Sequence, residues 1–264
     1  MFILYGKGDN GKTVFLSILR ELLQQYSVLL AIENLMTRQM DNNSNADLAD
    51  LCGARLVCTT ETEEGQRFAE GRLKRICQGM GTIKAVRKYE NPFEFPETHK
   101  LWLDCNYLPA STASGSLMNR LRIVPWEVTI PKSEQDPELR SKLLAEAEGI
   151  LAWIMSGAVD WYSHRLPTPD EVDQAAASYQ QQQDKLADWL EECCVTGNGF
   201  ESRAQALFDS YKQFSERNGE RNILDMKKFR VAMLAKNFQE DRKKLGVYWN
   251  DISLKKGQYP QCKV

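Results

Sequence analysis

The chain has 264 residues, 42% of them apolar, and a formal net charge of −2. This apolar content excludes a disordered or fibrous chain and is sufficient for one sizeable core and a further small domain. The seven cysteines include no C-x-x-C pair, and the chain has only two histidines. Neither a zinc ribbon nor a secreted disulfide framework is indicated. Because no apolar run has the length of a signal peptide or a membrane span, we expect a soluble, intracellular protein.

Charges are segregated along the chain, which the small net charge conceals. Residues 67–88 contain seven basic side chains and one acidic, residues 134–192 contain four basic and thirteen acidic, and residues 203–256 contain thirteen basic and seven acidic. Two basic regions are thus separated by an acidic one. This pattern favours a protein that meets a polyanion at particular surfaces, although solvated helix faces alone produce similar asymmetry.

A phosphate-binding loop follows the first apolar run. Residues 6–13 read GKGDNGKT and fit G-x-x-x-x-G-K-[ST]. A predicted strand, residues 2–5, precedes them and a helix pattern, residues 12–24, follows, which is the context that separates this motif from a chance glycine-rich turn. Lys12 supplies a charge for the outer phosphates of ATP, and the Thr13 hydroxyl is offered to Mg²⁺. The expected nucleotide-binding residues are Gly6, Gly8, Asn10, Gly11, Lys12, Thr13 and Val14.

Carboxylates end a second predicted strand. The apolar run 56–58 leads into TTETEE at residues 59–64. A buried strand that ends in acids about fifty residues after a phosphate loop fits a Walker B element, in which one acid holds Mg²⁺ and one polarises the attacking water. Glu61 is the first choice for both metal binding and catalysis, and Glu63 is the second. The alternative is an acidic N-terminus for a helix expected over residues 66–77.

Two further strands, residues 82–86 and 92–95, are expected to be joined by a basic tip. Beyond them the apolar strand 100–103 runs into DCNYLP at residues 104–109. An amide at the carboxyl end of a core strand lies beside the phosphate loop in an open parallel sheet, where Asn106 would align water against the terminal phosphate. The alternative for Asn106 is an ordinary turn residue before a proline.

Two arginines precede the last strand predicted in this region. Residues 117–126 read LMNRLRIVPW, so that Arg120 and Arg122 alternate with apolar residues. Alternation on a strand places both guanidinium groups on one face, where they are available to a phosphate or a carboxylate.

The ordered set of segments resembles the superfamily 3 helicases, specifically the phage, plasmid and poxvirus type of primase-helicase ATPase. The matching segments are GKGDNGKT, RLVCTTETEEGQRFAEGRLKRICQG, KAVRKYENPFEFPETHKLWLDCNYLP and NRLRIVPWEVTIP, continuing to GILAWIMSGAVDWY. The resemblance covers roughly residues 3–162 and implies an α/β P-loop ATPase of the AAA+ class that moves along single-stranded DNA as a ring. Such a ring is a homo-oligomer, and we expect a hexamer. The residues that it places in Walker A, Walker B and the sensor are Lys12, Thr13, Glu61, Glu63 and Asn106.

The resemblance also implies contacts beyond the nucleotide. The basic hairpin is expected to grip DNA in the ring channel through Lys84, Arg87 and Lys88. An arginine near Arg120 is expected to reach the ATP of the neighbouring subunit. Where many relatives have tandem arginines this chain has Asn119-Arg120, so the finger is either Arg120 or Arg122.

Relatives of this type usually carry a helical region before the first strand, often with a primase or polymerase domain further upstream. Here the chain opens five residues before Gly6. We therefore expect Met1 to be either a truncation point or the start of a reduced version whose ring assembly is impaired. An upstream primase domain or a separate primase is the corresponding partner.

A boundary is predicted after the ATPase region, residues 1–165. Prolines near residue 167 and a run of glutamines indicate a linker over residues 166–184, although residues 169–192 have helical spacing. A small domain over residues 185–264 is expected to follow.

Two predicted helices, residues 203–217 and 225–237, and a basic hairpin formed by residues 243–249 and 252–256 look like a winged helix. Such a module would place the helix that begins at Met226 on duplex DNA, mainly through phosphate contacts. The alternative is a solubilising or protein-docking module. Aromatic residues in such a hairpin, here Tyr248 and Trp249, are more often core than base-stacking residues.

The sequence therefore predicts ATP-driven unwinding or translocation on DNA, with ATP and Mg²⁺ as cofactors and no membrane partner. The expected setting is replication of a phage, plasmid or other mobile element in the cytoplasm of a bacterial host. Two alternatives stay open: an ATP-controlled origin-binding or loader switch without processive unwinding, and an NTPase that packages or pumps another polymer.

Overall fold

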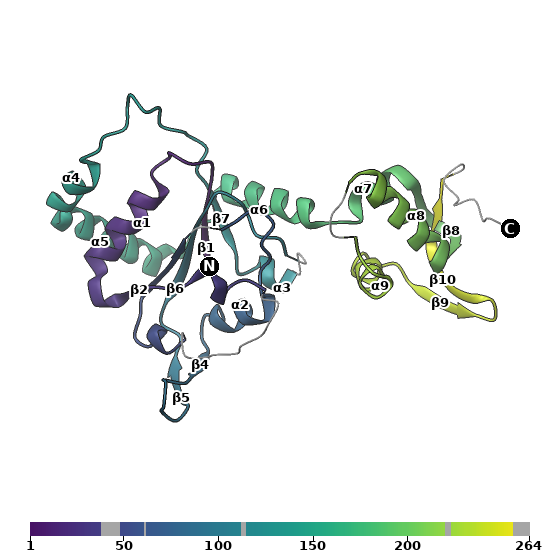
Figure 1. Cartoon of the computed structure of the whole chain (residues 1–264), viewed down its shortest axis with the longest axis horizontal. Coiled ribbons are helices and arrows are strands. Elements are labelled where there is room, and N and C mark those ends of the chain that lie inside the picture. Colours follow the sequence, from purple (N-terminus) through teal and green to yellow (C-terminus); the bar gives the residue numbers. More distant parts are fainter. Residues whose placement is uncertain (38–47, 61, 112–114, 220–222, 256–264) are drawn as a thin grey trace. The chain divides into compact units, whose positions relative to one another are not determined.

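The computed structural model describes residues 1–37, 48–60, 62–111, 115–219 and 223–255. The chain divides into two compact units, Met1–Gln183 and Asp184–Val264, and each unit is described by itself (Figure 1). None of the helices within the described ranges is both long and apolar enough to cross a membrane.

A five-stranded parallel sheet forms the centre of the first unit, with the strand order β2-β3-β6-β1-β7 (Figure 1). The strands are β1 (Phe2–Tyr5), β2 (Ser27–Leu29), β3 (Leu56–Thr60), β6 (Lys100–Cys105) and β7 (Arg122–Pro125). Because all of these strands run in the same direction, their carboxyl ends meet at one edge of the sheet. The predicted α/β class is confirmed, and only β2 was not expected from the sequence.

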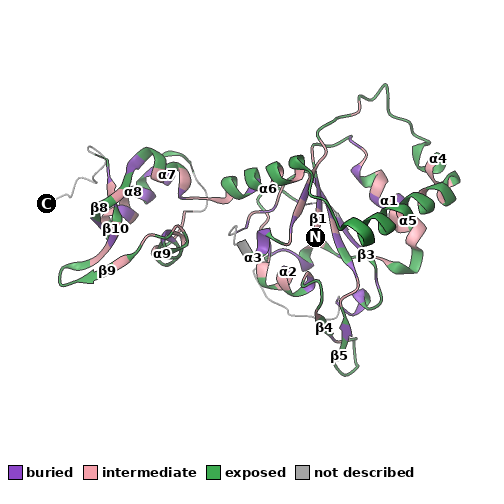
Figure 2. Ribbon diagram, turned by 180° about the vertical axis from the view of Figure 1, so that it is seen from behind, coloured by how far each residue is buried: buried purple, intermediate pink, exposed green. Residues whose placement is uncertain are grey.

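Helices cover both faces of this sheet. The helices are α1 (Lys12–Leu23), α2 (Glu70–Ile76), α3 (Gly115–Met118), α4 (Leu139–Ala145), α5 (Ala147–His164) and α6 (Asp170–Gln183). Successive strand residues point to opposite faces. Ile3 accordingly belongs to the same buried cluster as Leu73 of α2, and Leu4 belongs to a second cluster with Leu16 of α1. The buried positions therefore lie on both sides of the sheet (Figure 2).

Short 3-10 turns and a small hairpin complete the first unit. The turns are Gln24–Tyr26, Ile32–Asn34 and Ala49–Leu51, and the antiparallel hairpin is formed by β4 (Thr82–Ala85) and β5 (Phe93–Pro96). The hairpin confirms the two strands predicted around a basic tip. Before β3 the sequence predicts a loop over residues 41–45 and a helix over residues 46–51. Residues 41–47 lie outside the described residues, and the end of the expected helix is the 3-10 turn Ala49–Leu51.

Helix α6 occupies most of the stretch that the sequence analysis treats as a linker. Its residue Tyr179 is 1% exposed, and the Tyr179 hydroxyl donates a hydrogen bond to the Pro109 carbonyl at 2.6 Å. The backbone N–H of Ser111 donates to the Gln183 side chain at 2.9 Å. Residues 170–183 therefore pack on the first unit, because the helical spacing of this glutamine-rich segment turns one aromatic residue inward.

Helices and strands of the second unit surround an aromatic core. The elements are α7 (Ala187–Cys193), β8 (Cys194–Arg203), α8 (Ala204–Arg217), α9 (Met226–Ala235), β9 (Glu240–Lys243) and β10 (Gly246–Leu254). The strands form an antiparallel sheet in the order β8-β10-β9. Trp189 lies edge-on to Tyr211 and Phe229, and Trp249 is buried, as expected for a core residue.

The predicted hairpin of the second unit is placed differently in the structure. Its turn lies at Lys244 and Leu245, and the residues predicted as two strands fall largely on the single strand β10. Asp251, with φ 62°, marks a register shift in β10, which explains why the sequence looks interrupted there. Strand β8 was not predicted, because Gly197 and Gly199 interrupt its pattern.

Candidate nucleotide-binding site

The loop between β1 and α1 leaves the carboxyl edge of the sheet and is held there by close backbone packing. A Cβ atom on Gly6 would lie 2.1 Å from the Trp126 carbonyl oxygen, so only glycine fits at this position. Gly11 has φ 87° and allows α1 to begin directly at Lys12. The sequence thereby aims the N-terminus of α1, with its free N–H groups, into the space beside the loop.

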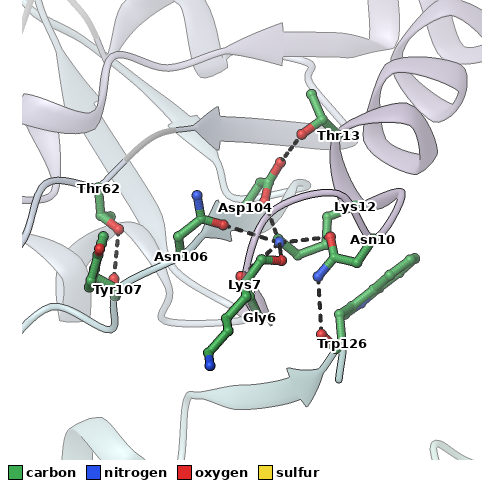
Figure 3. A network of polar contacts seen from close by, with 10 residues as sticks. All are labelled: Gly6, Lys7, Asn10, Lys12, Thr13, Thr62, Asp104, Asn106, Tyr107 and Trp126. Carbon is green, nitrogen blue, oxygen red and sulfur yellow. Dashed lines mark hydrogen bonds and ion pairs between the residues drawn. The ribbon is translucent and has the colours of Figure 1, made fainter. Parts of the chain in front are cut away.

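Lys12 lies inside this loop and is only 3% exposed. Its Nζ atom donates to the Gly6 carbonyl and to Asn10 Oδ1, both at 2.9 Å, and to Asn106 Oδ1 at 3.3 Å (Figure 3). The Asn10 amide in turn donates to the Trp126 carbonyl at 3.0 Å. The loop, α1 and the end of β6 are thus joined through the Lys12 ammonium group. The positive charge of this group would also attract an anionic phosphate.

Asp104, on β6, is a site residue that the sequence analysis did not identify. Thr13 Oγ1 donates to Asp104 Oδ2 at 2.7 Å, and Asp104 Oδ1 lies 3.9 Å from Lys12 Nζ (Figure 3). The Asp104 side chain is 9% exposed. The signal was present in the sequence, because residues 104 and 106 are two apart at the end of one strand and two-residue spacing favours one face.

These side chains surround a cavity of about 390 Å³. Among the described residues its lining is Gly8, Asp9, Asn10, Gly11, Lys12, Thr13, Val14, Thr62, Asp104, Cys105 and Asn106. The structure thus brings together Asn106 and nearly all of the predicted phosphate loop, and Gly6 joins them through its carbonyl bond to Lys12.

The predicted Walker B acids are less closely tied to this cavity. Glu61 lies outside the described residues. Glu63 is exposed, its N–H donates to Gln66 Oε1 at 3.2 Å, and it is not in the cavity lining described above. Thr62 is the residue between them that reaches the lining, and its hydroxyl donates to the Tyr107 carbonyl at 2.6 Å.

Cys105 also lines the cavity, yet its chemistry is that of a neutral group. Burial, reinforced by the neighbouring Asp104 carboxylate, raises the pKa of the Cys105 thiol to about 12. The thiol therefore stays protonated at neutral pH and is unsuited to act as a nucleophile or metal ligand. The oxygens of Thr13 and Asp104 are the hard donors that suit Mg²⁺.

The remaining predicted residues lie elsewhere in the first unit. Lys84, Arg87 and Lys88 are exposed on the β4–β5 hairpin (Figure 1). Arg120 lies in the turn before β7, where its guanidinium donates to the Cys77 and Ser116 carbonyls. Only Arg122 is on the strand, so the alternation argument for one shared face was wrong.

Arg122 pairs with Phe2 at the amino ends of β7 and β1, whereas the phosphate loop follows the carboxyl end of β1. Both arginines therefore lie at the edge of the sheet opposite the loop.

Comparisons with known proteins are consistent with this geometry. Residues 4–120 match a family of unknown function (DUF5906). The chain is 25% identical over 235 residues to "Putative helicase L207/L206" of Acanthamoeba polyphaga mimivirus, covering 81% of this chain and 24% of that protein. It is 26% identical over 207 residues to "Putative helicase 022R" of Frog virus 3, covering 71% of this chain and 21% of that protein. The chain thus spans under a quarter of the length of these relatives.

A solved structure gives the same fold. The apo A form of the NrS-1 C-terminal region matches with a TM-score of 0.51 and 16% identity, over 87% of this chain and 52% of that chain. Together the comparisons show a helicase-like fold for this chain.

Proposed function

We propose that the chain is an ATP-dependent DNA helicase or translocase of superfamily 3, acting in the replication of a virus, phage, plasmid or related mobile element. The observation that carries the proposal is the convergence of four polar side chains on one cavity at the carboxyl edge of the sheet. These side chains are Lys12, Thr13, Asp104 and Asn106. The viral relatives, which bear helicase names, support the same activity.

In this proposal each side chain has a separate task in hydrolysis. Lys12 neutralises charge that develops on the γ-phosphate, and Asn106 aligns the attacking water. Asp104 accepts a hydrogen bond from the Thr13 hydroxyl. The lone pairs of the Thr13 oxygen are therefore directed away from Asp104 and toward the cavity. Thr13 and Asp104 would hold Mg²⁺, which when bound neutralises phosphate charge. Glu61 remains the proposed general base, with Glu63 as the second choice.

One measurement separates the proposed helicase from the ATP-controlled switch. ATP hydrolysis by a translocase is expected to rise when single-stranded DNA is added, because movement couples turnover to the strand. An origin-binding or loader switch should instead bind ATP and turn it over slowly at the same rate with and without DNA. Steady-state ATPase rates with and without a single-stranded oligonucleotide decide between them.

Asp104→Asn tests the proposed magnesium site. Removing the carboxylate charge while keeping the shape is expected to raise the Mg²⁺ concentration needed for tight ATP binding by about 10- to 100-fold. ATP binding without Mg²⁺ should change much less. Both quantities are measured by titrating a fluorescent ATP analogue with and without Mg²⁺.

Two further variants make the Asp104 test specific. Asp9→Asn removes the same charge from an exposed position of the same cavity and should leave the Mg²⁺ requirement nearly unchanged. Thr13→Ala combined with Asp104→Asn should raise the Mg²⁺ requirement by less than the two single changes predict together, because the two residues act through one hydrogen bond. Additive effects, or equal effects of Asp9 and Asp104, contradict the assignment.

Replacing Lys84, Arg87 and Lys88 together by Ala tests the proposed DNA-binding hairpin. Each lost phosphate contact should reduce the slope of log affinity against log salt by about 0.7 for a single strand. The exposed residues Lys132, Arg140 and Lys142, changed together to Ala, are the matched control, with the same charge loss elsewhere in the unit. Equal affinities and slopes for both triple variants would make the hairpin an ordinary exposed turn.

The second unit is proposed to be a winged-helix domain that contacts duplex DNA. Its element order, helix–strand–helix–helix–strand–strand, and its sheet order β8-β10-β9 support this proposal. Lys227 and Lys228 are exposed on α9, the helix that would face the duplex, and Lys228 and Arg230 form ion pairs with Asp225 and Glu240, respectively.

A further inference from the structure

The tip of the β4–β5 hairpin contains a turn whose sequence does not suit its conformation. The Glu90 N–H donates to the Arg87 carbonyl at 3.0 Å, closing a four-residue turn. Tyr89, the third residue of this turn, has φ 67°, in the left-handed region. Glycine or asparagine is favoured at such a position, and a bulky side chain there is strained.

Burial does not compensate for this conformation. Tyr89 is 94% exposed, so its ring gains little from packing within the chain. The ammonium group of the adjacent Lys88 lies 5.2 Å from the centroid of the Tyr89 ring. A residue that is both strained and unpacked within the fold is most readily explained by a partner outside it.

The stem below Tyr89 is fixed, so the ring is presented on a rigid support. Ile83 and Phe95 of the two strands are buried in the core of the first unit. At the base of the hairpin, the N–H groups of Gln78 and Gly79 both donate to Glu97 Oε2 at 2.9 Å.

Near the tip, Arg87 lies 4.6 Å from the Phe93 ring centroid and 3.8 Å from the Glu90 carboxylate. The turn is thereby closed by a hydrogen bond, an ion pair and a cation–π contact, independently of Tyr89. The side chain of Tyr89 is thus not needed to hold the turn together.

We propose that Tyr89 is a stacking platform for a nucleobase of single-stranded DNA. This inference rests on the proposed function and adds a base contact to the phosphate contacts of the hairpin. An exposed aromatic ring beside Lys88 and Arg87 offers stacking to a base and positive charge to the adjacent phosphates. Bases in a duplex are already stacked and paired, so the platform selects a single strand. Stacking tolerates every base, which suits a translocase that must pass over any sequence.

Tyr89→Ala is expected to weaken binding of a single-stranded oligothymidylate by about 5- to 150-fold, the range for loss of one base–aromatic stack. Tyr89→Phe and Tyr89→Trp should retain most of the affinity, because stacking requires the ring and not the hydroxyl. Binding is measured with the full chain by fluorescence anisotropy at several salt concentrations. The salt slope should stay unchanged in Tyr89→Ala, because no charge is lost, in contrast to the triple basic variant.

Tyr89→Gly separates the ring from the backbone of the turn. Glycine suits the positive φ, so this variant should melt no lower than the unmodified chain yet bind the strand as weakly as Tyr89→Ala. Tyr162→Ala, which removes another exposed tyrosine of the same unit from α5, should bind normally.

An abasic strand of the same length provides the decisive comparison. It has the phosphates but no bases, so Tyr89→Ala and the unmodified chain should bind it equally. Unchanged oligothymidylate affinity in Tyr89→Ala, or an equal loss on the abasic strand, overturns the stacking role while leaving the proposed function intact. If the unmodified chain binds no single-stranded DNA at all, the proposed function and this inference fail together.

Discussion

Lys12→Ala is expected to reduce ATP hydrolysis by at least about 10²-fold, the usual effect of removing one preorganised group that stabilises transition-state charge. The Lys12 ammonium already lies at the loop, 2.9 Å from both the Gly6 carbonyl and Asn10 Oδ1. Its removal leaves the γ-phosphate without that charge, so nucleotide binding should weaken as well. Steady-state ATPase assays and titration with a fluorescent ATP analogue measure the two effects.

The control for Lys12→Ala is a lysine of the same loop. Lys7→Ala removes an exposed charge and leaves the carbonyl that accepts from Lys12 in place, so turnover should persist. Because Lys12 is buried, thermal melting must accompany the assay. Only a modest decrease is expected, since water in the 390 Å³ cavity can hydrate the oxygens that lose their donor. A folded Lys12→Ala protein with undiminished turnover excludes the phosphate-loop assignment.

Local patterns predicted the parts of the site that are continuous in sequence. The apolar run, the glycines and the following helix specify β1, the loop and α1 without reference to the rest of the chain. Asn106 was also predicted, because an amide directly after a core strand is a local signal. Each of these elements is recognised from its own local sequence. The hydrogen bond between Lys12 and Asn106, in contrast, joins two residues that are 94 positions apart in the chain.

Asp104 was missed because its importance depends on strand order. The acidic residues after β3 already accounted for a Walker B element. The local sequence pattern does not indicate that β6 lies between β3 and β1 in the sheet. That order puts the end of β6 directly beside the loop, where the Gly6 N–H donates to the Cys105 carbonyl at 3.3 Å. Glu63 illustrates the converse, since nearness in sequence to a strand end did not bring it into the cavity lining.

The linker prediction failed for a similar reason. Prolines and glutamines over residues 166–184 describe local composition, whereas the buried side chain of Tyr179 decides that α6 packs on the first unit. One buried aromatic side chain contributes about 1.5 to 3 kcal/mol, and the partly buried Ala175 of α6 packs against the same core. Composition averages over the segment and does not register such a contact.

Arg120→Ala is expected to bind ATP nearly normally and hydrolyse it about 10³- to 10⁵-fold more slowly, if Arg120 supplies charge to the γ-phosphate of a neighbouring subunit. Arg120 precedes β7, at the edge opposite the phosphate loop, and the strand between them is roughly 10 Å long at about 3.3 Å per residue. Within one chain the guanidinium is therefore directed away from the cavity, toward its carbonyl partners at Cys77 and Ser116. A catalytic role requires a second copy.

Mixing two inactive proteins tests that requirement directly. Lys12→Ala has a defective loop and an intact arginine, whereas Arg120→Ala has the reverse, so mixed assemblies contain composite sites with both groups and should regain turnover. Arg122→Ala, whose guanidinium donates to the Leu121 carbonyl at the same edge, is the parallel test for the other candidate. Melting curves and Arg120→Lys separate loss of the carbonyl contacts from loss of the finger, because lysine keeps the charge without the planar fork.

If folded Arg120→Ala and Arg122→Ala proteins both keep full turnover, or if mixtures shown to co-assemble never recover it, the in-trans mechanism is wrong for this chain. An ATP-controlled switch that acts without shared sites is then the better account.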